Sequence, residues 1–87
     1  IEAMADLINC YYDAGISHGD MKADNFLVHQ GKIIITDLDP MRHHRQTAKL
    51  QTALNRDIQR LLANWSGQQQ THIAALLARH LRPELEV

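Results

Sequence analysis

The chain has 87 residues, a formal net charge of −1, 45% hydrophobic residues and 22% charged residues. This length allows one small domain or a part of a larger one, and the near-neutral charge gives no general attraction to nucleic acid. No apolar run approaches the roughly 18 residues that cross a bilayer, and the single cysteine, Cys10, excludes an intramolecular disulfide and predicts a buried thiol in a reducing, cytoplasmic compartment.

The first predicted element is an amphipathic helix over residues 1–14. Its apolar residues recur at helical spacing, and they are Ile1, Met4, Ala5, Ile8, Tyr11 and Tyr12. Gly15 follows, and glycine takes the left-handed conformation that commonly ends a helix. Residues 16–23 have no sustained period, which predicts a loop that carries polar chemistry.

Two short runs of apolar and β-branched residues predict a β-hairpin. They are Phe26–Val28 and Ile33–Thr36, and His29-Gln30-Gly31 lies between them. The acidic segment Asp37-Leu38-Asp39-Pro40 ends the second strand, because proline cannot extend a hydrogen-bonded ladder.

Two further helices complete the predicted order. A stripe of apolar residues predicts a helix from Thr47 to Trp65, broken by Ser66-Gly67. The stripe consists of Leu50, Leu54, Ile58, Leu61, Leu62 and Trp65. Ile73, Leu76, Leu77 and Leu81 mark a third helix that ends near Pro83. The predicted fold class is α+β and mainly helical: helix, catalytic loop, hairpin, acidic metal loop, two helices.

The candidate chemistry lies in the segments on either side of the hairpin's two strands. The loop reads His18-Gly19-Asp20-Met21-Lys22-Ala23-Asp24-Asn25, and the acidic segment begins at Asp37. Phosphoryl transfer needs in-line positioning, neutralised phosphate charge and a base beside the attacking hydroxyl. Asp20 is the candidate base and Lys22 the candidate cation for the γ-phosphate. Asn25 and Asp37 offer the oxygen ligands that magnesium prefers.

Two residues of these segments allow more than one role. His18 is expected to brace the loop by a hydrogen bond to the backbone near Asp37, and a catalytic acid–base role is the alternative. Asp39 could act as a third metal ligand or could cap the following turn, and the sequence favours neither.

The order of these motifs resembles the protein-kinase-like superfamily. Three phrases, H-G-D-M-K-A-D-N-F-L-V, I-T-D-L-D-P-M-R-H-H and R-D-I-Q-R-L-L-A-N-W, resemble most closely the bacterial lipopolysaccharide core kinases, which phosphorylate heptose or Kdo sugars. The resemblance implies ATP and Mg²⁺ as cofactors, a saccharide or lipid-linked saccharide acceptor, and a cytoplasmic enzyme with peripheral contact at the inner face of the bacterial inner membrane. It implies Asp20 as the catalytic aspartate, Lys22 as the catalytic-loop lysine, and Asn25 and Asp37 as the metal and nucleotide ligands.

The sequence also departs from the protein-kinase pattern. Gly19 stands where protein kinases have arginine, which argues against activation by phosphorylation. Asp39 replaces the glycine of D-F-G, and no A-P-E-like segment follows to support a peptide substrate. No G-x-G-x-x-G loop and no strand lysine of the small lobe occur. Residues 1–87 are therefore expected to form a single partial C-terminal lobe without the N-terminal nucleotide lobe, inactive alone and prone to self-association.

Two other functions compete with this prediction. An aminoglycoside or choline type of small-molecule kinase is disfavoured by Lys22, and a non-catalytic kinase-like fragment is disfavoured because Asp20, Asn25 and Asp37 are all present.

The basic residues are open to two interpretations. Arg42-His43-His44-Arg45 could bind an acidic acceptor or could be a solvated loop, and the solvated loop is slightly favoured. Arg56 and Arg60 beside Asp57 suggest ion pairs on a helix surface. The six histidines lack the spacing of a zinc site.

Overall fold

The computed structural model describes all residues from 1 to 87 and contains three helices and two small antiparallel sheets. In chain order the elements are α1 (Glu2–Ala14), β1 (Ile16–Ser17), the 3₁₀ turn η1 (Ala23–Asn25), β2 (Phe26–His29), β3 (Lys32–Ile35), β4 (Arg42–His43), α2 (Thr47–Leu62) and α3 (Gly67–His80). The predicted α+β class with a helical majority is confirmed.

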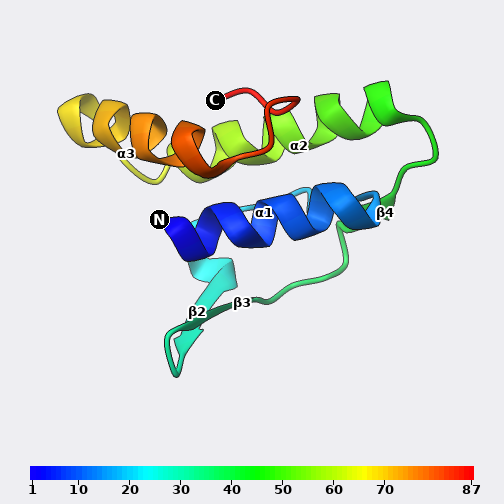
Figure 1. The fold of residues 1–87 in the computed structure, drawn as a ribbon. Coiled ribbons are helices and arrows are strands. Elements are labelled where there is room, and N and C mark those ends of the chain that lie inside the picture. Colours follow the sequence, from blue (N-terminus) through cyan, green and yellow to red (C-terminus); the bar gives the residue numbers. More distant parts are fainter.

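Helix α1 lies between the pair α2 and α3 on one side and the β2–β3 hairpin on the other (Figure 1). The apolar stripes of the three helices face one another and form the core. The buried core residues are Ala5, Ile8, Met21, Leu50, Leu54, Ile58, Leu61, Leu62, Leu77, Leu81 and Leu85. Met21 belongs to the loop from His18 to Asn25 and is part of this core, so helix packing holds the loop in place.

A short strand that the sequence pattern did not predict follows the turn after α1. Gly15 has φ +77°, and its N–H donates to the carbonyls of Tyr11 and Tyr12, as expected of a helix-ending glycine. The chain then enters β1, which pairs antiparallel with β4, so that Ser17 lies opposite Arg42. The prediction of an unbroken loop over residues 16–23 was therefore wrong, because a two-residue strand is too short to show a period.

Helix α3 begins earlier than the apolar residues indicated. Ser66 precedes its first residue, Gly67, whereas α2 ends at Leu62, before the predicted end at Trp65. The amide of Asn9, a buried residue of α1, fixes the other end of α3: its Nδ2 donates to the carbonyl of His80 at 2.8 Å, and its Oδ1 accepts from the N–H of Arg82 at 2.8 Å. Cys10 beside it is exposed, which corrects the prediction of a buried thiol, because it lies on the outer face of α1.

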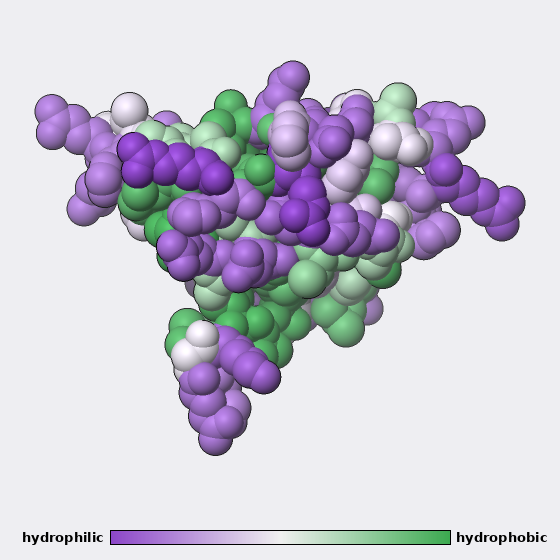
Figure 2. Space-filling view, viewed as in Figure 1, coloured by the Kyte–Doolittle hydropathy of each residue, from purple (hydrophilic) through white to green (hydrophobic).

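The predicted hairpin is present, but His29 belongs to β2 and not to the turn, and the hairpin is largely exposed. Phe26 pairs with Ile35 and His29 with Lys32, and Gln30 and Gly31 form the two-residue turn with φ values of +51° and +75°. Val28 is 78% exposed, and apolar atoms gather on the surface where the hairpin meets the helices (Figure 2). No helix of the chain is long and apolar enough to cross a membrane.

Candidate functional site

His18 is fully buried and connects the catalytic loop to the end of the hairpin. The N–H of Asp20 donates to Nδ1 of His18 at 3.1 Å, and Nε2 of His18 lies 3.2 Å from the carbonyl oxygen of Thr36. Because Nδ1 accepts a hydrogen bond, the proton of the neutral ring is on Nε2, which donates to Thr36. His18 thus makes the backbone bond expected of a bracing residue, next to Asp37.

Asp57 anchors the same loop from α2. Its Oδ2 accepts from the N–H of His18 at 2.8 Å, and its Oδ1 accepts from the N–H of Gly19 at 2.8 Å. Burial raises the pKa of the Asp57 carboxyl, and the two backbone hydrogen bonds lower it only in part. The two bonds orient the peptide units immediately before Asp20.

The carboxylate of Asp20 is partly exposed and lies between two cations. Lys22 Nζ is 3.6 Å from Oδ2, and Arg60 Nε is 3.6 Å from Oδ1. Nδ2 of the buried Asn25 donates to the Asp20 carbonyl at 2.9 Å and lies 3.4 Å from Oδ2. The candidate base, the candidate cation and one candidate metal ligand are therefore in mutual contact.

The base of the hairpin places Asn25 beside the acidic segment. The N–H of Thr36 donates to the Asn25 carbonyl at 2.7 Å, so Asn25 and Asp37 stand one residue apart across the hairpin. Asp37 has φ +56°, a conformation that non-glycine residues rarely adopt and that is enriched at functional sites.

The oxygen atoms at this place are of the type that magnesium binds. The Asn25 amide donates only through Nδ2, which leaves Oδ1 without a protein donor, and Asp37 and Asp39 are exposed. The turn after Asp39 is closed by the Met41 N–H donating to the Leu38 carbonyl at 3.0 Å, so Asp39 does not cap it. No three His, Cys, Asp or Glu side chains meet as a metal cluster. Magnesium commonly uses one or two carboxylates together with water and substrate phosphates.

Comparison with known proteins identifies the family. Residues 1–76 match the model of the RIO domain, and this match includes the catalytic loop, the hairpin, the acidic segment and α2. The chain belongs to the RIO domain family. RIO kinases are members of the protein-kinase-like superfamily, so the predicted superfamily and the general prediction of a kinase are confirmed. No curated protein and no solved structure matches the chain.

Three contacts of this RIO domain were missed in the sequence. Asp57 and Arg60 were interpreted as surface ion-pair residues, but Asp57 is 3% exposed and Arg60 contacts Asp20. Asn64 Oδ1 accepts from the N–H of Ala23 at 2.9 Å, at the end of the catalytic loop. A signal for Asp57 was present, since Leu54, Asp57 and Leu61 share the buried face of one helix.

The four basic residues after the acidic segment do not act as one cluster. Arg42 and His44 line a pocket beside the catalytic loop, whereas His43 approaches Gly15 at the end of α1. This division follows from β4, where successive side chains point to opposite faces.

Proposed function

We propose that this RIO domain supplies the base and the magnesium ligands for transfer of the γ-phosphoryl group of ATP to an acceptor hydroxyl. One observation carries the proposal: His18 and Asn25 connect the backbone of Asp20 to the residue that precedes Asp37. The candidate base and the candidate metal ligands thereby share one hydrogen-bonded framework.

Each side chain has a distinct part in the proposed reaction. Asp20 accepts the proton of the attacking hydroxyl, and Lys22 offsets negative charge on the transferred group. Asn25 Oδ1 and the Asp37 carboxylate would hold Mg²⁺, with Asp39 as a further oxygen, and the ion would neutralise charge at the phosphates. His18 positions Asp20 and Asp37 and does not exchange protons with the substrate.

We further propose that the acceptor is a saccharide, of the lipopolysaccharide inner-core class that the resemblance suggested. Support comes from the short connection between Asp37 and α2, which runs only from Leu38 to Gln46. A Cβ on Gly19 would lie 2.9 Å from Pro40, so this connection packs directly on the catalytic loop. Such a short connection offers little platform for an extended peptide, and a small sugar needs none.

The test of phosphotransfer uses the protein as it occurs in its source cells, with an inner-core saccharide, ATP and Mg²⁺. We expect Asp20→Asn to lower kcat by on the order of 10²–10⁴. Asp24→Asn is the matched control, because Asp24 is an exposed residue of the same loop, and its rate should equal that of the wild type. Wild-type turnover by Asp20→Asn would contradict the proposal.

A second test concerns the metal and needs no turnover. Residues 1–87 contain no small-lobe phosphate loop, so we propose that alone they turn over little ATP. Mn²⁺, a paramagnetic substitute for Mg²⁺, should broaden the amide signals around Asn25 and Asp37 in this chain. Asp37→Asn should weaken that effect, and Asp6→Asn on the exposed face of α1 should not. Equal broadening in both variants would count against the assigned ligands.

A further inference from the structure

A pocket of about 410 Å³ opens beside the catalytic loop and has a strongly basic lining. The basic side chains are those of Arg42, His44, Arg56 and Arg60. They come from two elements that are distant in sequence: β4 is brought to the site by its pairing with β1, and α2 presents the other two residues. That Arg42 and His44 meet Arg56 and Arg60 was not predicted from the sequence.

Two of the three arginines in this pocket have no carboxylate partner. Arg42 and Arg56 are exposed and take part in none of the chain's salt bridges or side-chain hydrogen bonds. The only carboxylate in the lining is that of Asp57, and both of its oxygens already accept backbone N–H groups. An anion that entered the pocket would therefore meet free guanidinium donors, which suit phosphate and carboxylate geometry.

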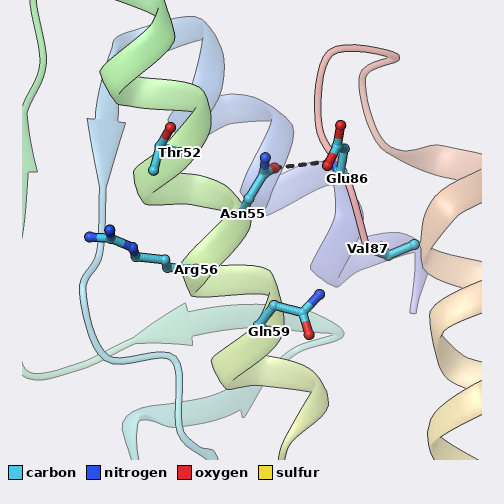
Figure 3. A pocket seen from close by; sticks show the side chains of 6 residues that line it. All are labelled: Thr52, Asn55, Arg56, Gln59, Glu86 and Val87. Atoms are coloured by element: carbon cyan, nitrogen blue, oxygen red, sulfur yellow. Dashed lines mark hydrogen bonds between the residues drawn. The ribbon is translucent and has the colours of Figure 1, made fainter.

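Neighbouring acidic residues do not neutralise Arg56. Glu86 lies in an adjoining pocket with Arg56, but its backbone N–H is bound to Asn55 Oδ1 at 2.9 Å and its carboxylate forms no ion pair with Arg56. In Figure 3 the Arg56 side chain extends from α2 away from Glu86, toward the strand and loop that contain Ser17. The guanidinium of Arg56 is thus directed to the side of the basic pocket.

The pocket also adjoins the candidate base. Arg60 lines the pocket, and its Nε is 3.6 Å from Oδ1 of Asp20. Ser17, also in the lining, is bonded through Oγ to Nε2 of His44 at 2.7 Å, which fixes the imidazole against β1. A molecule held in the pocket would consequently have the rest of its structure beside Asp20.

We propose that this pocket binds a phosphate or carboxylate group that the phosphoryl acceptor carries, so that the substrate is an anionic molecule. The assignment of the bound group to the acceptor rests on the proposed function. The binding of an anion by the pocket does not, since it follows from the arrangement of four basic side chains.

The experiment is an NMR titration of ¹⁵N-labelled residues 1–87 with inorganic phosphate, glucose 6-phosphate, glucuronate and glucose. We expect the three anions to shift the amide signals of Ser17, Gly19 and Arg42, and glucose to leave them unchanged. Arg56→Gln and Arg42→Gln should each weaken phosphate binding about tenfold, which corresponds to about 1.4 kcal/mol. Arg79→Gln, at an exposed position in the last turn of α3, should bind phosphate like the wild type.

The outcomes separate the pocket from the reaction. No shift with any anion, or equal weakening by Arg56→Gln and Arg79→Gln, would overturn the anion site. Shifts with phosphate but not with glucuronate would restrict the group to phosphate and support the site.

The acceptor assignment is tested by KM in the transfer assay: Arg56→Gln should raise KM for a phosphorylated saccharide and not for its neutral counterpart. An unchanged KM together with lost phosphate binding would overturn the acceptor assignment alone, and a lack of any transfer would overturn the proposed function alone.

Discussion

The catalytic loop, and the acidic segment at the end of the β2–β3 hairpin, contain the two halves of the candidate site, and the chain holds them in opposite ways. Met21 and His18 of the loop are fully buried, and every buried polar side-chain atom has a hydrogen-bond partner. The hairpin exposes Val28, Leu27 and Ile34, and only its base, at Phe26 and Ile35, packs against the helical core. The positions of the base and of the buried Asn25 are therefore set by core packing, and that of Asp37 by a two-stranded unit of low intrinsic stability.

The largest predicted difference between the two regions is in the cost of removing an apolar side chain. Leu54→Ala, at a position with 0% exposure in α2, should lower the free energy of unfolding by about 3 kcal/mol, because it leaves a cavity. Val28→Ala in the hairpin should change it by less than about 0.5 kcal/mol. Urea unfolding of both variants measures the contrast, and equal losses would show that the hairpin is part of the core.

A second, smaller effect is expected from the anchor of the catalytic loop. Asp57→Asn keeps one acceptor oxygen but places an NH₂ group, which cannot accept a hydrogen bond, against the second backbone N–H. The loss of this bond should destabilise the chain by about 2 kcal/mol. Asp6→Asn on α1 is the control for loss of a charge at an exposed position. Equal unfolding free energies of the two variants would show that the two bonds of Asp57 do not stabilise the loop.

The same variant has a predicted pH dependence. Burial raises the pKa of Asp57 above its ordinary value of 3.8, so the folded state binds this proton more tightly than the unfolded state. The stability contributed by this group is then greatest at low pH and declines as the pH rises through its raised pKa. The difference in unfolding free energy between wild type and Asp57→Asn should be larger at about pH 4 than at pH 7, and a difference that shrinks on acidification would contradict the sign.

Hydrogen exchange compares the regions without any substitution. The amides of β2 and β3 should exchange through local opening at a free energy at least about 1 kcal/mol below that of the α2 amides, because few buried contacts oppose separation of the hairpin. Addition of Mg²⁺ should slow exchange at Thr36 and not at Leu54. Uniform protection over the chain would mean that the hairpin opens only when the whole domain unfolds.

The smallest effect is expected at the surface. Arg82 forms a two-bond ion pair with Asp13, of which the shorter is 2.7 Å, and this bond lowers the pKa of the Asp13 carboxyl. Its contribution is present above the ordinary value of 3.8 and is lost as the pH falls, the opposite sign to Asp57. Asp13→Asn should therefore give a small loss of stability at pH 7 that disappears on acidification, measured by thermal unfolding.

Local patterns predicted what depends on local spacing. The bounds of α1, the left-handed Gly15 and the existence of the hairpin follow from periodicity and turn chemistry. The pairing of β1 with β4 and the reach of Asp57 to His18 join residues far apart in the chain. These contacts depend on how the elements pack, which the spacing of residues within one element does not contain.

The imidazole of His18 has a mechanical consequence for the whole site. Its two nitrogens lie on one planar ring, so the separation between the Asp20 amide and the Thr36 carbonyl is set by a spacer with no internal rotation. We therefore expect a displacement of the acidic segment to move the backbone of Asp20 as well.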